Sequence, residues 1–546
     1  MMGTGAGNEE AGTAVLVADP QAAAAGPAAA SAGTEVAAGV DTGDRTAAGA
    51  ETSPRWVRHV GWSLLGVQLV VMLVFSTVEY HRFALTEDFA SYSQAWWAIA
   101  HGNLDPYLTG LGVPFWKNNA EFAMWPLALL YRVDPHPIIL LWVQDVAAFL
   151  TEVVAFAWIG KAIARAGGRI PKGVGYVLAL GAAVVLVADP WVYETIAFDF
   201  HFEPLAALFV VLVGYDLWSG RTRRMWWWVP LALVSTGLAA LFLVGVGLSG
   251  ILAGRRTRRP GALIAVVGAA WFVVCSAVGA IGDGGTTFRA SYGYLAPGHH
   301  GRIGPLDVMI GALGHPGAVV HVAATHWAVL LSFLVVFGVI GLLSPWGIGM
   351  AFVVLVPNVL DGSGTFVRYG ASFQSWPAMP FILVGSVMVL IGLFQRGEMA
   401  RRMAAVIMAL WAAFLVMFAV VALPGLPRAW LSVSPPAAAE LARIAPQIPP
   451  DAEVVVTVPV MGRFAERSSF DAFFEDHQKV PIDRAVVVFV FSPYEAAYQK
   501  NLTGNGLAEA TRYVARRLDA RVLGSGAGVH AFSWSPPPET RSVTLP

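Results

Sequence analysis

Residues 226–254, WWWVPLALVSTGLAALFLVGVGLSGILAG, form an uncharged apolar stretch between Arg224 and Arg255. The stretch has roughly 30 residues, which is too long for one membrane-spanning helix of about 20 residues and too short for two. Ser235-Thr236-Gly237 lies near its middle, where a turn can fall. We therefore predict a short helical hairpin that does not reach the far membrane surface. Irregular backbone at that depth must line a cavity or be covered by protein.

Other apolar stretches along the chain meet the length that a membrane-spanning helix needs. They cover roughly residues 59–79, 138–160, 174–194, 203–219, 261–281, 326–343, 346–360, 376–395 and 403–424. The composition agrees, because 56% of the residues are hydrophobic and only 13% are charged, against about 25% in soluble domains. The sequence predicts an α-helical polytopic membrane protein with about eleven membrane segments, the hairpin counted as two. A net charge of −1 without a basic patch argues against a nucleic-acid partner.

Lysine and arginine are concentrated in alternate connections between these segments. The clusters are Arg55/Arg58, Lys161/Arg165/Arg169/Lys172, Arg221/Arg223/Arg224, Arg255/Arg256/Arg258/Arg259 and Arg396/Arg401/Arg402. Basic residues mark the cytoplasmic side of a membrane protein. We therefore expect a multi-pass protein of the cell membrane, with a cytoplasmic N-terminus and the C-terminus outside.

The two ends of the chain differ from the apolar region. Residues 1–54 are rich in Ala and Gly without sustained periodicity, which predicts a disordered cytoplasmic tail. Residues 55–427 would then form the transmembrane domain, with an interfacial helix in its first outer loop. Residues 428–546 alternate between helix and strand patterns, which predicts a small extracytoplasmic α/β domain. Within it, GSGAG from Gly524 is followed by a strand pattern, so we interpret it as a hairpin turn rather than a phosphate loop.

The first candidate site segment, LTEDFASYSQAWWAIA, follows the first apolar span. From Glu87 to Ala100 its aromatic and apolar residues have helical spacing, which predicts an amphipathic helix in the membrane interface. Glu87 and Asp88 begin this helix, where the helix dipole stabilises carboxylates. They could serve a reaction, or they could simply be the N-terminal charges of the helix.

The second candidate segment, AFDFHFEPL, lies in a short loop between two apolar spans and carries Asp199, His201 and Glu203. Ionisable groups near membrane depth are costly, which favours a functional role over a solvated loop. Asp-x-His-x-Glu alone is weak evidence for a metal site. Arg368, in another outer loop, could bind a phosphate or pair with a carboxylate such as Asp361.

These two segments together resemble a family of bacterial membrane proteins known as domain of unknown function 2079. DFASYSQAWW resembles the family pattern D-L-G-x-Y-D-Q-A-L-W, and FDFHFEPL resembles its F-D-F-H-P-E segment. The layout is similar over most of residues 60–540. The family is in turn similar in layout to the GT-C glycosyltransferases, membrane enzymes that take a sugar from a polyprenyl-phosphate carrier. The resemblance implies a GT-C-like transmembrane domain.

The resemblance also implies roles for individual residues. Asp88 would be the catalytic base, with Glu87 beside it. Together with Arg368 from the outer loop, the full set of candidates is Asp88, Glu87 and Asp199 as catalytic residues and Tyr92, Gln94, His201, Glu203 and Arg368 as substrate-binding residues. A cation for the leaving phosphate would be Arg368 or a divalent metal held by Asp199 and Glu203.

The chain departs from the family pattern at three places. Ser93 replaces the second acid of the first motif, Ser235-Thr236-Gly237-Leu238 replaces a Lys-Glu-Asp cluster, and Glu121-Phe122-Ala123-Met124 lacks the histidine of a His-Phe-x-Pro segment. These changes remove charged groups from the expected pocket, so activity could be weakened, altered or absent.

Three hypotheses follow for function. The first is a glycosyltransferase-like membrane protein that moves a sugar from a polyprenyl-phosphate donor to an envelope acceptor. The second is a transporter or lipid-carrier protein that uses the same cavity without chemistry. The third is a non-catalytic envelope assembly protein whose outer domain binds a partner.

Overall fold

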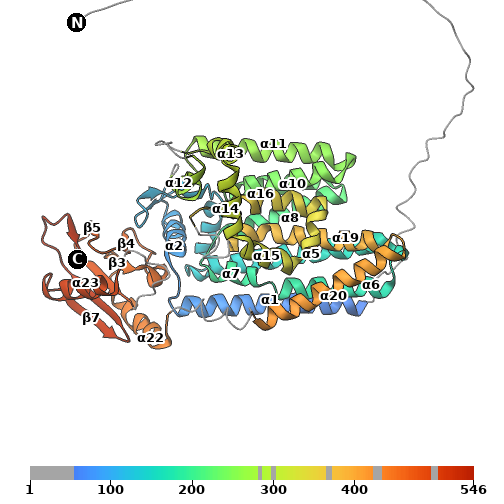
Figure 1. Cartoon of the computed structure of the whole chain (residues 1–546). Coiled ribbons are helices and arrows are strands. Elements are labelled where there is room, and N and C mark those ends of the chain that lie inside the picture. Colours follow the sequence, from blue (N-terminus) through green and yellow to red (C-terminus); the bar gives the residue numbers. More distant parts are fainter. Residues whose placement is uncertain (1–54, 281–285, 297–302, 364–371, 422–432, 493–501) are drawn as a thin grey trace, which may run out of the picture. The chain divides into compact units, whose positions relative to one another are not determined.

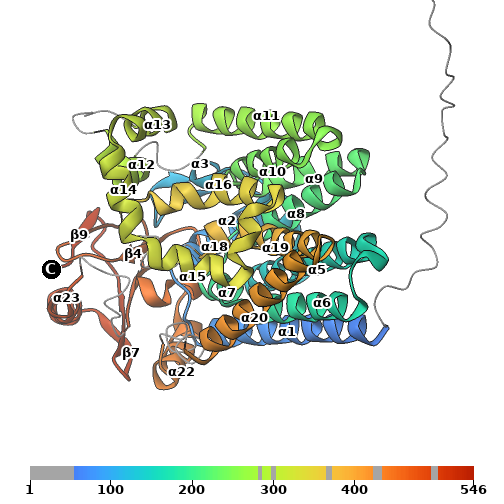
Figure 2. The same ribbon diagram turned by 45° about the vertical axis from the view of Figure 1, so that its right-hand side comes forward.

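The computed structural model describes residues 55–280, 286–296, 303–363, 372–421, 433–492 and 502–546. The tail predicted over residues 1–54 lies outside the described residues. Residues from Glu51 onward form one compact unit of the chain. Figures 1 and 2 show a bundle of helices followed by a smaller region that contains a sheet.

Among the described residues, six helices are long and apolar enough to cross a membrane. They are Trp56–His81, Ile138–Arg169, Lys172–Ala197, Arg255–Ala277, Trp376–Phe394 and Glu398–Phe418. A seventh is possible if Leu306–Gly314 and Pro316–Thr325, which meet at a bend of 99°, count as one span. These stretches contain α1 (Arg55–His81), α5 (Ile138–Ala166), α6 (Lys172–Val187), α7 (Pro190–Ala197), α11 (Arg255–Ala277), α13 (Pro305–Gly314), α14 (Pro316–Thr325), α19 (Met379–Phe394) and α20 (Glu398–Val421).

The expected number of about eleven spans is not confirmed. The remaining predicted segments do form helices, but each is shorter than the 18 residues required of a candidate span. They are α8 (Glu203–Ser219), α9 (Thr222–Ser235), α10 (Ala239–Ala253), α15 (Trp327–Phe337) and α16 (Pro345–Val359). Sequence hydropathy does not separate these helices from full spans because they are equally apolar.

The predicted break in the stretch 226–254 is confirmed. Helix α9 ends at Ser235, α10 begins at Ala239, and the turn between them contains Thr236. Helix α10 lies very close to α11. A Cβ atom on Gly247 would be only 2.6 Å from the Ala265 amide nitrogen and the Gly261 carbonyl oxygen, so no larger residue fits there. Small residues allow such close approach of helices in membranes.

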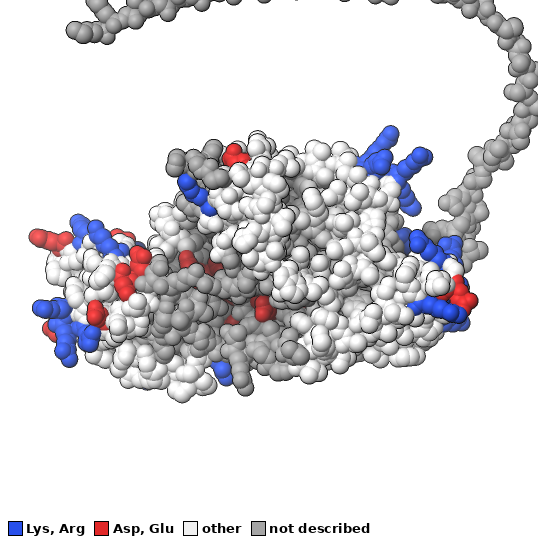
Figure 3. Space-filling view, in the orientation of Figure 1, with Lys and Arg blue, Asp and Glu red and all other residues white. Residues whose placement is uncertain are grey.

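Basic side chains gather at one end of the helical bundle. Figure 3 shows them at the right-hand end of the view, which in Figure 1 is the end where α6, α11 and α20 begin. Most of the surface between this end and the C-terminal region is uncharged. On the face that Figure 3 shows, the basic side chains of the helical bundle are thus concentrated at one end. Which side of a membrane this is stays a prediction.

The C-terminal region contains a β-sheet with helices beside it, as predicted, and we refer to it as the C-terminal domain. Its five-stranded sheet has the order β4-β3-β6-β8-β7, in which β3 is parallel to β4 and β6, and β8 is antiparallel to β6 and β7. The strands are β3 (Glu453–Thr457), β4 (Phe470–Phe473), β6 (Val487–Phe491), β7 (Arg521–Gly526) and β8 (Val529–Trp534), and β5 (Lys479–Pro481) pairs separately with β9 (Ser542–Thr544). The GSGAG segment forms the β7–β8 hairpin, as predicted; β4, β5 and β9 were not predicted.

Helices cover both faces of this sheet. Successive strand residues point to opposite faces. Val454 and Val456 accordingly share a core with α22 (Pro435–Ile444), whereas Val455 shares a core with α23 (Gly504–Arg516).

Helix α2 (Glu87–Ala100) has the predicted bounds but is more buried than an interfacial helix. Ten of its 14 residues are buried. It packs against the short helix η9 (Val458–Arg463) of the C-terminal domain and against η2 (Ala128–Arg132). The C-terminal domain thus covers a helix that sequence patterning alone places at a surface.

The C-terminal domain is tied to the start of α2 through backbone and side-chain bonds. The Gly462 amide donates to the Leu85 carbonyl oxygen at 2.9 Å. The Arg463 guanidinium lies 4.1 Å from the centre of the Tyr80 ring and donates to the Tyr80 carbonyl oxygen at 3.2 Å. These contacts fix the direction in which the chain enters α2.

Candidate functional site

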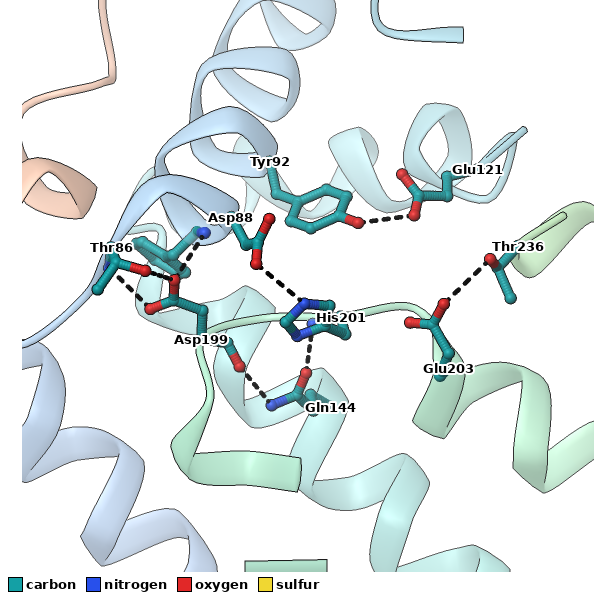
Figure 4. A network of polar contacts seen from close by, with 10 residues as sticks. Thr86, Asp88, Tyr92, Glu121, Gln144, Asp199, His201, Glu203 and Thr236 are labelled. Atoms are coloured by element: carbon teal, nitrogen blue, oxygen red, sulfur yellow. Dashed lines mark hydrogen bonds and ion pairs between the residues drawn. The ribbon is translucent and has the colours of Figure 1, made fainter. Parts of the chain in front are cut away.

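The two predicted segments meet at the N-terminal end of α2. Asp88 Oδ2 lies 3.3 Å from His201 Nε2, an ion pair when the imidazole is protonated (Figure 4). The Asp88 side chain is 48% exposed, whereas the His201 side chain is 5% exposed. A buried histidine therefore holds a carboxylate that solvent or a substrate can reach.

Asp199 caps α2 from outside the helix. One carboxylate oxygen accepts from the Thr86 amide at 2.8 Å, and the other accepts from the Thr86 hydroxyl and, at 3.5 Å, from the Phe89 amide. Thr86 is the N-cap residue of α2 but makes no side-chain cap bond of its own. The first amides of a helix need such partners. Asp199 therefore positions the helix turn that carries Asp88.

Gln144 on α5 holds the loop that carries Asp199 and His201. Its amide nitrogen donates to the Asp199 carbonyl oxygen at 2.9 Å, and its side-chain oxygen accepts from the His201 amide at 2.5 Å. The sequence analysis missed this residue. A lone polar side chain inside an apolar span was the available signal, because such groups are costly in a membrane.

Two further carboxylates of the network have neutral partners. The Tyr92 hydroxyl donates to Glu121 Oε1 at 2.6 Å, and the Thr236 hydroxyl donates to Glu203 Oε1 at 3.3 Å. Figure 4 shows both pairs on the same side of His201, to its right in the view. Glu121 and Thr236 belong to the segments that depart from the family pattern. The substituted positions therefore remain part of the polar network.

The other predicted site residues lie in different settings. Gln94 is bound to Thr109, accepting from its amide at 3.0 Å, and to the Arg467 carbonyl oxygen of the C-terminal domain. Ser93 is fully buried. Glu87 is partly buried as the first residue of α2. Arg368 lies outside the described residues.

Electrostatics favour a charged His201 opposite Asp88. Burial acts to lower the pKa of His201, but the hydrogen bond and charge of Asp88, with the charges of Glu203 and Asp199, outweigh burial and raise the pKa. Burial, followed by the charge of Asp88, raises the pKa of Asp199 to about 6. Burial and the charges of Asp88 and Asp199 raise the pKa of Glu87 to about 7. The site therefore concentrates carboxyl groups around one histidine.

A divalent metal held by Asp199 and Glu203 does not fit this geometry. Both oxygens of Asp199 face the N-terminus of α2, and Glu203 accepts from Thr236. Among the described residues, no three His, Cys, Asp or Glu side chains are grouped so that they could hold a metal ion.

The capping role of Asp199 can be tested by two substitutions. Its backbone has φ +56°, a left-handed conformation that asparagine tolerates better than alanine. We expect Asp199→Asn to cost about 1 kcal/mol, the usual loss for a helix cap, and Asp199→Ala to cost about 1–2 kcal/mol more. Thermal unfolding of the purified protein in detergent measures both. Equal losses for the two variants would contradict the capping geometry.

The fold and the polar network define a helical membrane protein that carries an α/β domain at the end where its site lies. The chain belongs to the family described as "Predicted membrane protein (DUF2079)", whose model matches residues 83–510. This range contains both site segments and most of the C-terminal domain. No curated protein matches the chain.

Two solved structures are weakly similar to the chain. ArnT from Cupriavidus metallidurans bound to undecaprenyl phosphate has 13% sequence identity and a TM-score of 0.44, over 87% of this chain and 98% of that one. The apo state of the same protein has 12% identity and a TM-score of 0.37, with the same coverage.

Proposed function

We propose that this protein is a membrane glycosyltransferase that transfers a sugar from a polyprenyl-phosphate donor to a hydroxyl group of an envelope acceptor. The observation that carries the proposal is the half-exposed Asp88 carboxylate at the edge of an otherwise buried network. Three groups fix its position: His201 directly, and Asp199 and Gln144 through the backbone. A general base needs this combination of access and fixed position. The donor class rests on the resemblance of the two site motifs to their family.

In the proposed reaction, Asp88 accepts the proton of the acceptor hydroxyl as its oxygen attacks the anomeric carbon. The new carbon–oxygen bond forms while the bond from that carbon to the phosphate oxygen breaks. The polyprenyl phosphate leaves with the electron pair of the broken bond. The contact with His201 keeps the Asp88 carboxylate aimed at the acceptor.

The leaving phosphate requires a cation, and we assign this role to Arg368. A guanidinium can bind two phosphate oxygens at once. Tyr92 and Glu203 would line the sugar-binding space beside His201. We place the site on the outer face of the cell membrane, with the C-terminal domain extracytoplasmic, because the basic helix ends lie away from Asp88.

Binding of polyprenyl-phosphate sugars to the purified protein in detergent tests this function. We expect saturable binding, weakened about tenfold or more by Arg368→Ala, since a charge-assisted bond contributes about 1.5–3 kcal/mol. Arg396→Ala, at the basic end of the bundle, is the matched control and should bind as wild type. Absence of binding across several sugars would favour the transport or assembly hypotheses.

A further inference from the structure

A line of buried polar side chains runs along α1 and α5, which pack against each other. It consists of Gln68, Ser76 and Glu79 on α1 and Asp145 and Glu152 on α5, each at most 1% exposed. We call this set the polar seam. Asp145 and Glu152 are seven positions apart, so they share one face of α5 and stand about 10.5 Å apart along its axis. The seam thus extends well into the helical bundle.

The polar seam has more hydrogen-bond acceptors than donors. The Ser76 hydroxyl donates to Asp145 Oδ1 at 3.1 Å, and the Gln68 amide donates to the Leu186 carbonyl oxygen at 3.1 Å. Among the described residues, no hydrogen-bond partner lies at Gln68 Oε1, Glu79 Oε2 or Asp145 Oδ2, and the side-chain donor that acts on the two carboxylate oxygens of Glu152 is Gln68. Buried polar atoms are normally satisfied, so this excess of acceptors calls for additional donors.

One end of the seam adjoins the candidate site. The charges of Asp199 and Asp145 both act on Glu79. Gln144, next to Asp145 in the chain, bonds to the backbone of Asp199 and His201. This end of the polar seam therefore lies within electrostatic reach of the network around Asp88.

The other end of the seam lies at Glu152. Its titratable neighbours are Asp189, which accepts from the Trp376 indole, and Tyr193. Gln68 lies beside it. None of the ion pairs made by the described residues includes Glu79, Asp145 or Glu152. No cation in the described part of the chain therefore balances these carboxyl groups.

The occupant that fits this chemistry is the proton. An ionised carboxylate buried without a cation loses several kcal/mol of solvation, whereas a carboxylic acid supplies the missing donor and carries no charge. Carboxyl groups along a membrane helix that face a protein interior are typical of proton relays. The proposed glycosyl transfer uses none of these side chains, so their presence needs another explanation.

We propose that the polar seam binds and conducts protons, which enter beside the candidate site and reach Glu152 inside the helical bundle. Protons pass between Glu79 and Asp145, which accepts from the Ser76 hydroxyl, and cross the distance of about 10.5 Å along α5 to Glu152 over water molecules. The same seam would deliver a proton to the site or remove one from it. This function goes beyond the proposed transfer and does not depend on a sugar donor.

Infrared spectroscopy of the purified protein in lipid at neutral pH tests the proposal, because protonated carboxyl groups have a separate carbonyl band. We expect Glu152→Gln to remove part of this band. We also expect the Glu152 component to shift rapidly in deuterated water, and Asp145→Asn to slow that shift about tenfold or more, which corresponds to about 1.4 kcal/mol in the barrier.

The matched control is Asp216→Asn, which removes a fully buried carboxylate that is ion-paired with Arg224 and should leave both the band and its exchange unchanged. A carbonyl band that is the same in wild type and Glu152→Gln would overturn proton binding at Glu152. If the Glu152 component exchanges as fast in Asp145→Asn as in wild type, the proposed proton path through Asp145 is wrong. Thermal unfolding of each variant identifies loss of the fold. Since no sugar donor is added, failure here is distinct from failure of the proposed transfer.

Discussion

Replacing Asp88 with asparagine is expected to lower sugar transfer by about 10²–10⁴-fold, the usual contribution of a general base. Asparagine has nearly the same shape and can still accept a hydrogen bond from His201, so the position of the side chain is preserved. It cannot accept the acceptor's proton. We therefore expect kcat to fall while the thermal stability and the affinity for the polyprenyl-phosphate donor change little.

Two other substitutions serve as controls for Asp88→Asn. Asp105→Asn changes an exposed acid in the same outer segment and should leave transfer unchanged. Glu87→Gln changes the neighbouring carboxyl group, which has a pKa of about 7, and should have a much smaller effect than Asp88→Asn. Transfer at the wild-type rate by Asp88→Asn would remove Asp88 from the mechanism. Loss of sugar transfer in Glu87→Gln alone would identify Glu87 as the base.

The second large effect is expected from Gly462→Ala, far from Asp88 in the sequence. A Cβ atom at Gly462 would lie 2.6 Å from Leu85 Cβ, 2.9 Å from the Phe89 ring and 3.0 Å from the Leu85 carbonyl oxygen. The start of α2 must then move, and Asp88 moves with it. A displacement of about 1 Å can cost about 100-fold in rate, so we expect a loss of that order in kcat. Overpacking should also cost about 1–3 kcal/mol of stability.

Gly504→Ala is the matched control for this substitution. It lies at the start of α23 in the same domain, and a Cβ atom there would meet no other atom within 4 Å. Its transfer rate and stability should match those of the wild type. Wild-type transfer by Gly462→Ala would show that the C-terminal domain does not position α2.

Local patterns in the sequence were sufficient to predict several elements. The bounds of α2, the break between α9 and α10, and the β7–β8 hairpin each follow from a few consecutive residues whose spacing or turn chemistry has one interpretation. The two candidate segments could also be selected from the sequence, because carboxylates beside apolar spans are conspicuous, and they lie together in the structure.

The sequence could not predict the hydrogen-bond partner of each polar side chain in the site. The Asp199 carboxylate resembles a catalytic or metal-binding group in the sequence, but its bonds to Thr86 and Phe89 exist only in the folded chain. Gln144 lies on α5 and Thr236 in the turn between α9 and α10, and the positions of these two elements relative to the site depend on packing. The predicted number of spans is not confirmed for a related reason, since helices too short to count as candidate spans can be as apolar as full ones.

The bond from Gln94 to Arg467 joins residues 373 positions apart. At about 5–20 residues per second, a ribosome needs roughly 20–75 s to make the intervening chain. During that interval α2 lacks its cover from the C-terminal domain, so Asp88 lacks part of the support for its final position. During biosynthesis, the segment that carries Asp88 is therefore made early. Its contacts with the C-terminal domain form only after the last part of the polypeptide has been made and has folded.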